Sequence, residues 1–223
     1  MTKIIRLNVQ EKNYKSKERS VKVLKNFHLD VKRGEKVAVV GKSGSGKTTL
    51  LNILGLLDRN YVGSYELFGE NTKNLNLTEM AKLRNGRIGF ALQESALIHS
   101  LTIEENIKLP LLYAKSSDKR KDTDFNHIVK AIGIESILQK KPLECSGGEK
   151  SRAVFARAMI MNPEIILCDE STASLDEENK NAIINLLFQM NQRFMTTIVT
   201  VTHDISVAQQ HDRIIQITKE LPV

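Results

Sequence analysis

The chain has 223 residues, of which 41% are hydrophobic and 26% are charged, an ordinary composition for a globular protein. No apolar run approaches the ~20 residues that a membrane-spanning helix needs, and the N-terminus lacks the continuous apolar stretch of a secretion signal, so we expect a cytoplasmic protein. The net charge of +7 is spread along the chain and aromatic residues make up only 5%, so we expect no nucleic-acid partner.

The first half of the chain predicts strands followed by a helical region. Residues 3–33 predict short strands and turns. The apolar run Lys36–Val40 is typical of a buried strand, and the apolar spacing over residues 48–57 predicts a helix after it. Residues 115–121, the densest basic cluster, predict a solvated loop. Residues 94–161 predict mainly helix, because apolar residues recur at roughly helical spacing at Ile128, Val129, Ile132 and Ile134, and again at Val154, Ala158 and Met161.

The second half of the chain contains three more apolar runs, and each predicts a buried strand. They cover residues 164–168, 196–201 and 213–218, and helical stretches over 177–193 and 205–210 separate them. Strands that alternate with helices predict an α/β fold with a mostly parallel sheet. The two cysteines, Cys145 and Cys168, lack metal-ligand spacing, and Cys168 is expected to be a small buried side chain.

A glycine-rich segment follows the first buried strand and opens the first predicted helix. Its glycines let the backbone wrap closely around an anion and point N–H groups at phosphate oxygens, while the helix start adds positive potential. Its lysine would neutralise the outer phosphates and its threonine would coordinate Mg²⁺. A glycine-rich turn without a ligand is the alternative, which the strand–loop–helix context disfavours. The segment matches G-x-x-x-x-G-K-[ST] in full, with Thr49 next in the chain: Gly41, Lys42, Ser43, Gly44, Ser45, Gly46, Lys47 and Thr48.

Two acidic residues end the second buried strand. Asp169 and Glu170 follow the run Ile165-Ile166-Leu167-Cys168. Because ligands collect at the carboxyl ends of strands in an open α/β sheet, these acids are expected beside the phosphate loop. Side chains alternate along a strand, so the two acids are given separate roles: Asp169 holds Mg²⁺, and Glu170 orients or deprotonates the attacking water. The alternative is a strand end followed by a polar turn.

With these two motifs in place, the chain resembles the ATP-binding-cassette (ABC) ATPase family over essentially its whole length. Gln93 resembles the glutamine of that family's Q-loop, and residues 145–149 (CSGGE) resemble its signature. Asp176 lies in a segment (SLD) that resembles the D-loop, and His203 resembles the switch histidine. Tyr14, 27 residues before Gly41, resembles the aromatic residue that stacks on adenine.

Each of these resemblances also has a simpler structural explanation. Ser146 and Glu149 form the pattern of a helix capping box, which is compatible with a role in anion binding. His203 could be a polar residue at a helix start, and Gln93 could be a surface glutamine. Tyr14 lies in a polar stretch, where it could simply be exposed.

The resemblance implies a P-loop NTPase (RecA-like) fold: a mostly parallel core with an N-terminal antiparallel β subdomain and an inserted helical subdomain. In a single ABC domain over 1–223, the core and β lip cover 1–93 and 162–223, and the helical subdomain covers 94–161. It implies ATP and Mg²⁺ as cofactors, with Thr48, Gln93 and Asp169 at the metal. It gives Glu170, His203, Gln93 and Lys47 catalytic roles. The nucleotide contacts would be Tyr14, the segment Gly41–Thr49, Ser146, Gly147, Gly148 and Asp176.

The resemblance also implies partners. Two copies, forming a homodimer, would pair head to tail and sandwich two ATP molecules, each held by the phosphate loop of one copy and by Ser146, Gly147 and Gly148 of the other. A permease on a separate chain would hold the dimer on the inner face of the membrane, and the region after Gln93 would transmit motion to it. Residues 80–84 and 101–113 resemble the subgroup of macrolide exporters, lipoprotein-release ATPases and antimicrobial-peptide or bacteriocin exporters.

Several positions depart from the family pattern. Cys145 replaces the usual leucine of the signature, Lys150 and Ser151 replace glutamines, and Ser171 replaces a proline. None of these changes removes a group that bonds phosphate or metal, so catalysis is expected to survive. They do put the placement within the subgroup in doubt, and Cys145 could weaken the packing behind the signature.

Three functions compete at this stage. The first is an ATPase subunit that drives export or membrane extraction of a peptide, lipid-linked or drug-like substrate. The second is a DNA-associated ABC ATPase, which the 53 positions between Gln93 and Ser146 disfavour because they leave no room for a long coiled coil. The third is a regulatory ABC ATPase that binds a membrane partner without transport, and the sequence does not reject it.

Overall fold

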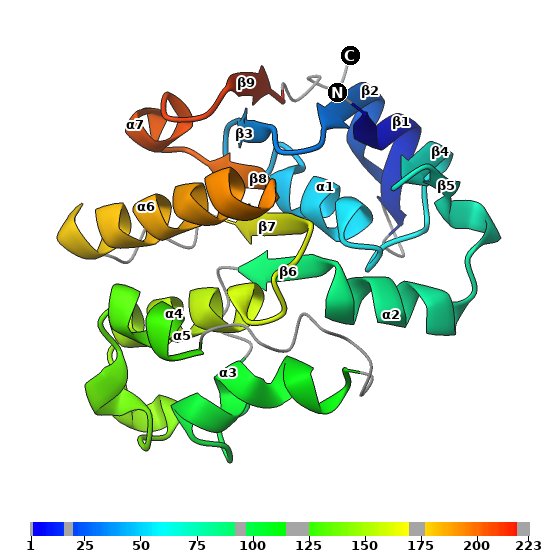
Figure 1. Ribbon diagram of the computed structural model, residues 1–223. Helices are drawn as coiled ribbons and strands as arrows, with labels where there is room; N and C mark the ends of the chain where they lie inside the picture. Colours follow the sequence, from blue (N-terminus) through cyan, green and yellow to red (C-terminus); the bar gives the residue numbers. More distant parts are fainter. Residues whose placement is uncertain (1, 16–19, 92–96, 115–124, 170–176, 218–223) are drawn as a thin grey trace. The chain divides into compact units, whose positions relative to one another are not determined.

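The computed structural model describes residues 2–15, 20–91, 97–114, 125–169 and 177–217 (Figure 1). The chain divides into two compact units. The first comprises Met1–Met80 and Val199–Val223, and the second comprises Ala81–Ile198. Among the helices of the described ranges, none combines the length and the apolar character that crossing a membrane requires.

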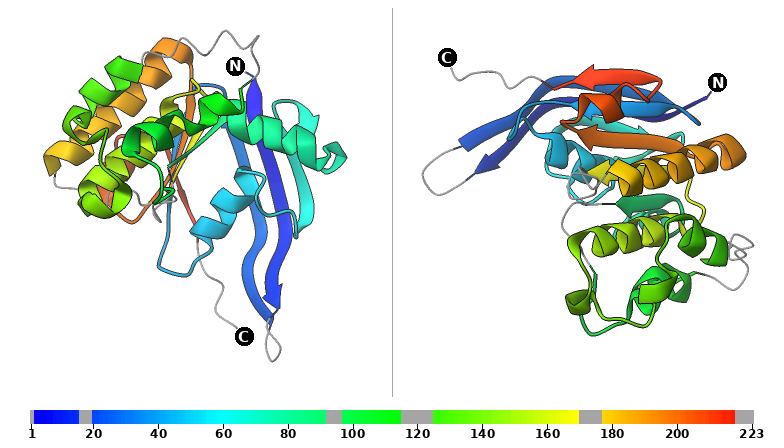
Figure 2. Two further views of the ribbon diagram at one scale, coloured as in Figure 1. Left: turned by 90° about the horizontal axis from the view of Figure 1, so that it is seen from below. Right: turned by 90° about the vertical axis from the view of Figure 1, so that its left-hand side faces the viewer.

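The first unit contains a four-stranded antiparallel sheet in the order β2-β1-β4-β5. Residues 3–33, predicted as short strands and turns, instead form two strands of 13 residues each, β1 (Lys3–Lys15) and β2 (Ser20–Lys32), which run side by side in Figure 2. Buried Ile5, Leu7 and Val9 alternate with exposed polar neighbours, which explains why β1 is long and continuous. β4 (Val62–Leu67) and β5 (Glu70–Asn71), which were not predicted, complete this sheet.

Each unit contains a pair of parallel strands. In the first unit, β3 (Lys36–Val40) pairs in parallel with β9 (Arg213–Gln216). The unit also contains the short 3₁₀ helix η1 (Thr72–Asn74) and the helix α7 (Ile205–Ala208). β8 (Thr197–Thr202) and α2 (Leu77–Gly86) both cross the division of the chain. The predicted α/β architecture with a parallel sheet and an N-terminal antiparallel sheet is therefore confirmed.

The helix α1 (Lys47–Leu54) is shorter than its predicted range of 48–57. Gly55 closes the helix, and Leu56 adopts a left-handed conformation with φ of 58°. The chain therefore leaves the helical path before Leu57, and this side chain, predicted on the apolar face, is 53% exposed.

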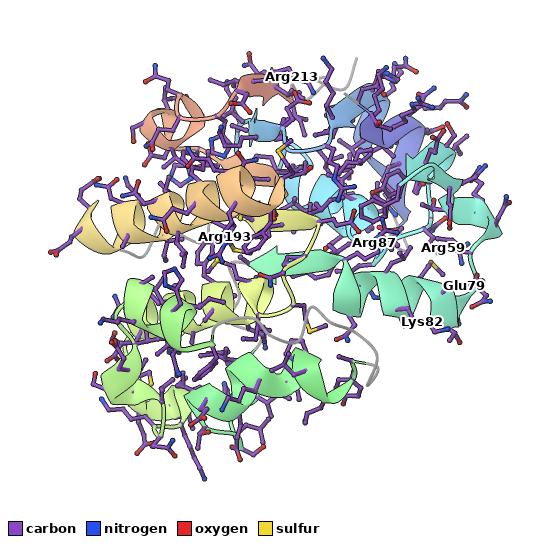
Figure 3. The ribbon with its side chains drawn as sticks, in the orientation of Figure 1. Arg59, Glu79, Lys82, Arg87, Arg193 and Arg213 are labelled. Carbon is purple, nitrogen blue, oxygen red and sulfur yellow. The ribbon has the colours of Figure 1, made fainter. Side chains whose placement is uncertain are left out.

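The second unit is mainly helical around a pair of parallel strands, β6 (Ile88–Ala91) and β7 (Ile165–Asp169). Arg87 and Glu164 tie the starts of these strands together, with 2.6 Å between Arg87 Nε and Glu164 Oε1 (Arg87 is labelled in Figure 3). The unit also contains α3 (Ile103–Leu112), α4 (Phe125–Ala131), η3 (Glu135–Ile137), η4 (Pro142–Glu144), α5 (Gly147–Met159) and α6 (Glu177–Phe194).

The helices of the second unit pack on one hydrophobic core. Ile103 and Ile107 of α3, Phe155 of α5 and Ile183 of α6 are fully buried or nearly so in this core. Cys168 lies in the same core, as predicted for a small buried side chain. The residues predicted from helical spacing in this region are also buried: Ile128, Val129, Ile132, Ile134, Val154, Ala158 and Met161. The helices are shorter than predicted, because α4 ends before Ile132 and α5 ends before Met161.

Candidate nucleotide-binding site

The glycine-rich loop of the first unit lies between β3 and α1, as predicted. Gly44 and Gly46 have φ of 72° and 99°, in the left-handed region that favours glycine. At Gly46 a Cβ atom would also lie 2.9 Å from both Cγ1 and the carbonyl oxygen of Val23. At Gly41 a Cβ atom would lie 2.6 Å from Ser45 Oγ. The loop thus has a conformation and a closeness to its neighbours that exclude larger residues.

The polar groups of this loop are arranged to receive an anion. Lys47 is buried and curls back, so that its Nζ donates to the carbonyl oxygens of Gly41 (3.0 Å) and Lys42 (3.2 Å). The buried hydroxyl of Ser45 has no hydrogen-bond partner among the described residues. Gly46 is the N-cap of α1 and, as a glycine, supplies no side-chain cap to this helix start. The N–H groups of the helix start, the ammonium group and the unpartnered Ser45 hydroxyl fit a phosphate chain.

Tyr14 lies in the same unit and close to this helix. Its hydroxyl is 3.5 Å from the Thr49 hydroxyl and donates to Asp58 Oδ2 at 3.2 Å. Tyr14 is 46% exposed, which a stacking aromatic side chain requires. The structure therefore brings the predicted adenine contact next to the first turn of α1.

His203 follows β8 and is exposed. The helix start that comes next is capped by Asp204, whose Oδ1 accepts the N–H of Ser206 at 2.8 Å and of Val207 at 3.4 Å. Capping α7 is thus the role of Asp204, and His203 is not needed for it.

In the second unit, Asp169 is the last residue of β7 and is only 6% exposed. A buried carboxylate is costly unless a cation or hydrogen-bond donors compensate its charge. Within the described ranges, no group of three or more His, Cys, Asp and Glu side chains forms a metal cluster.

The signature segment of the second unit opens α5. The Ser146 hydroxyl accepts the N–H of Glu149 at 3.2 Å, and Glu149 Oε2 accepts the N–H of Ser146 at 2.6 Å, so the predicted capping box is present. The hydrogen bond from the Ser146 backbone lowers the pKa of Glu149. A Cβ atom on Gly147 would meet no described atom within 4 Å. The fold of the described residues therefore gives no steric reason for glycine at this position.

Cys145, which replaces the leucine of the family pattern, is buried, and its Sγ donates to the Lys141 carbonyl oxygen at 3.4 Å. Burial is the largest cause of the raised pKa of this thiol. Cys145 belongs to the hydrophobic core of the unit, so it takes part in the packing behind the signature.

Several predicted residues lie outside the described part of the chain. They are Gln93, Glu170, Asp176 and the basic segment 115–121. Sequence reasoning missed Lys12 and Asp58, which contact Tyr14. A lysine two residues before Tyr14 was the available signal.

The comparisons with known proteins agree with these features. The family described as "ABC transporter" matches residues 24–173. The lipoprotein-releasing system ATP-binding protein LolD of Francisella tularensis subsp. tularensis (strain FSC 198) is 40% identical over 204 residues, which cover 91% of this chain and 88% of LolD. The bacitracin export ATP-binding protein BceA of Halalkalibacterium halodurans is 41% identical over 204 residues, covering 92% of this chain and 81% of BceA.

Solved structures give the same result. The dimeric structure of MJ0796, a bacterial ABC transporter cassette, superposes with a TM-score of 0.87 at 39% identity and covers 96% of this chain and 94% of the cassette chain. A dimeric post-hydrolysis state of MJ0796 bound to ADP and Pi has a TM-score of 0.87 at 38% identity, with the same coverage.

Proposed function

Because the chain belongs to the ABC transporter family, we propose that it powers export, or extraction from the membrane, of a peptide, lipid-linked or drug-like substrate through a permease on a separate chain. The chain is an ATP-binding transporter subunit and an ATPase, and the resemblance carried by its motifs is confirmed. The names of LolD and BceA, a lipoprotein-releasing and a bacitracin export protein, support the direction of transport proposed here.

One observation carries the nucleotide role of this chain: α1 starts directly after a loop whose left-handed conformations at Gly44 and Gly46 favour glycine. Backbone N–H groups at this start and the ammonium of Lys47 bind the phosphates of ATP. The hydroxyl of Ser45, buried without a partner among the described residues, donates to a phosphate oxygen. We assign the exposed Thr48 and the buried Asp169 to Mg²⁺. A bound Mg²⁺ would neutralise the charge that develops on the phosphates during hydrolysis.

Three further residues complete the proposed catalytic set. Glu170 follows Asp169 in the chain and takes the proton of the attacking water. Gln93 orients that water at the metal. His203, exposed beyond the end of β8, contacts the outer phosphate.

We further propose that a second copy of the chain completes each site. Gly147 supports this proposal. A Cβ atom at this helix start would have open space, so no described residue requires glycine there. An approaching phosphate would supply the reason. Ser146, Gly147, Gly148 and Asp176 would serve the ATP that is bound by the other copy, and the dimeric form of MJ0796 supports the pairing.

A cavity in the second unit supports the proposed contact with a permease. It has a volume of about 260 Å³ and lies among the residues of α2, β6, α3 and α5. Two of its lining residues, Arg84 and Arg157, are basic, and burial lowers the pKa of Arg157. A cytoplasmic segment of the permease would insert here and hold the subunit at the inner face of the membrane. The full lining comprises Arg84, Asn85, Ile88, Gly89, Phe90, Leu109, Pro110, Arg157, Ala158 and Met161.

Two variants test the proposed site. Glu170→Gln should bind MgATP and hydrolyse it at least about 100-fold more slowly, since general base catalysis is lost, and should therefore accumulate as an ATP-bound dimer in gel filtration. Ser146→Arg should bind ATP as a monomer and neither dimerise nor hydrolyse. A Glu170→Gln protein that turns over at the parental rate, or an active Ser146→Arg protein, would reject these roles.

A transport assay tests the proposed export. The subunit is reconstituted with its permease in proteoliposomes, and ATP-dependent movement or release of substrate is measured beside ATP hydrolysis. Hydrolysis that depends on the permease but moves no substrate would identify a regulatory ATPase instead. Arg84→Glu should prevent co-purification with the permease and leave ATP binding intact.

A further inference from the structure

A buried lysine lies beside the proposed adenine contact. Lys12 on β1 is only 2% exposed, although lysine is seldom buried without a partner. Its Nζ is 2.9 Å from Asp58 Oδ1 and 2.7 Å from Asp58 Oδ2. It also donates to the carbonyl oxygen of Asn60 at 2.7 Å. Lys12 thus connects β1 to the loop that follows α1.

The same ammonium group contacts the ring of Tyr14. Lys12 Nζ lies 4.5 Å from the centroid of the Tyr14 ring, within the range of a cation–π contact. Asp58 holds the other end of the ring by accepting the Tyr14 hydroxyl at 3.2 Å. Both members of the ion pair therefore contact Tyr14 as well as each other.

These contacts restrict how Tyr14 meets a ligand. The ammonium occupies one face of the ring, while the side chain as a whole is 46% exposed. The Tyr14 hydroxyl points to the first turn of α1, 3.5 Å from the hydroxyl of Thr49, which comes directly after the phosphate loop. The opposite face of the ring is then left for a flat, polarisable group that is attached to a phosphate chain.

We propose that the Lys12–Asp58 ion pair is a positioning device that fixes the Tyr14 ring beside the start of α1, with one face presented to the adenine base. This inference rests on the proposed nucleotide site. Lys12 and Asp58 do not touch the nucleotide; they act through Tyr14, by covering its inner face and orienting its hydroxyl.

The surroundings of Asp58 agree with an ionised carboxylate. Burial alone would raise the pKa of Asp58, but hydrogen bonds from Lys12 Nζ and from the N–H of Asn60 outweigh it and lower that pKa. The Asp58 carboxylate therefore stays ionised at neutral pH and keeps its hydrogen bonds to Lys12 and Tyr14. A purely structural pair, joining β1 to the loop at 58–60, is the competing explanation that the experiment must separate.

The experiment measures the dissociation constant of MgATP and the kcat of ATP hydrolysis for single and double variants. Lys12→Met and Tyr14→Ala should each weaken ATP binding by about 5- to 150-fold, the range expected for loss of one stacked base. In Lys12→Met, kcat at saturating ATP should stay close to the parental value. Lys12→Arg, which keeps the charge, should recover most of the affinity. Asp58→Asn is the second probe if Lys12→Met does not fold.

The double variant decides between positioning and structure. If Lys12 acts through Tyr14, Lys12→Met should weaken ATP binding no further in a Tyr14→Ala background. Arg6→Met is the matched control, because Arg6 on the same strand pairs with Glu66 on β4 at 3.1 Å, away from Tyr14, and should leave ATP affinity unchanged.

Additive losses in the double variant, or a fall in kcat equal to the loss of affinity, would overturn the positioning role and leave a structural pair. Unchanged ATP affinity in Lys12→Met would overturn it as well. A failure of the nucleotide site itself looks different, because the parental protein would then show no ATP binding that any variant could weaken.

Discussion

The helix starts at α1 and α5 both contain glycine, as the N-cap Gly46 and as the first residue Gly147, but they are built in opposite ways. At α1, the fold excludes side chains at Gly46 through a φ of 99° and through contact with Val23, and this glycine supplies no side-chain cap. At α5, Ser146 and Glu149 cap the helix in both directions, and a Cβ atom on Gly147 would have open space. The contacts within its own unit thus require glycine in the phosphate loop, whereas the described residues around Gly147 do not require glycine there.

This difference shows how one chain can supply two kinds of phosphate contact. We expect the start of α1, with its N–H groups and the Lys47 ammonium inside a tight loop, to bind phosphate in a single copy of the protein. We expect the capped start of α5 to be stable in a single copy. The open space at Gly147 would then admit a phosphate that is bound by the second copy. The two regions should therefore respond differently to matched substitutions.

The largest expected effect comes from the charge in the phosphate loop. Lys47→Ala removes the ammonium that lies over the loop carbonyls and would contact the phosphates, so MgATP affinity should fall by about 10- to 100-fold, as for loss of a charged hydrogen bond. Isothermal titration calorimetry measures this change in the monomer. Unchanged affinity would mean that the loop does not bind the phosphates.

A methyl group at the glycine of the first helix start should destabilise the fold. Gly46→Ala forces alanine into a left-handed conformation and against Val23, so the free energy of unfolding should fall by about 1–3 kcal/mol from the backbone conformation alone. Urea denaturation followed by circular dichroism measures it. An equally stable variant would show that the loop does not need glycine there.

The same substitution at the second helix start should have the opposite sign. Gly147→Ala should stabilise the protein by about 0.4–1 kcal/mol, because alanine fits the open space and restricts the unfolded chain. Its ATPase activity should nevertheless fall, since the methyl group lies where the phosphate of the second copy would approach. If the variant kept full activity, the proposed role of Gly147 in the dimer would be wrong.

The smallest expected effect is a loss of folding stability at acidic pH, which originates at the start of α5. The pKa of Glu149 is lowered in the folded protein by the backbone hydrogen bond from Ser146, so its contribution to stability is present above the ordinary carboxyl pKa and is lost as the pH falls through the folded value. Glu149→Gln should remove this part of the pH dependence. Urea midpoints at neutral and acidic pH compare the two proteins, and an identical acid response in both would contradict the assignment.

The sequence predicted the parallel strands well, because continuous apolar runs such as Lys36–Val40 bury on both faces and have clear ends. It predicted the N-terminal region poorly. The alternation of Ile5, Leu7 and Val9 predicts only a short strand, because the residues at 10–13 after it are all polar, yet pairing with β2 and β4 on both sides makes β1 one long strand. The early end of α1 depends on the left-handed Leu56, which local sequence does not specify.

The candidate site was predictable where a residue type is required by chemistry. The phosphate loop and the capping box at Ser146 could be placed from their spacing alone. The contacts of Tyr14 could not, because Lys12 and Asp58 are 46 residues apart and meet only when β1 lies beside the end of α1. The roles of Gln93, Glu170 and Asp176, outside the described residues, stay predictions, as do the boundaries of the helical subdomain at 94 and 161.

Direct titration of the purified, folded protein with ATP in the presence of magnesium tests the central claim, that the loop from Gly41 to Thr48 encloses the phosphates of a nucleoside triphosphate. Calorimetry should give saturable binding of one ATP per chain, weakened in Lys47→Ala and retained in Ser146→Arg. A folded protein that takes up no ATP at any magnesium concentration would contradict the account.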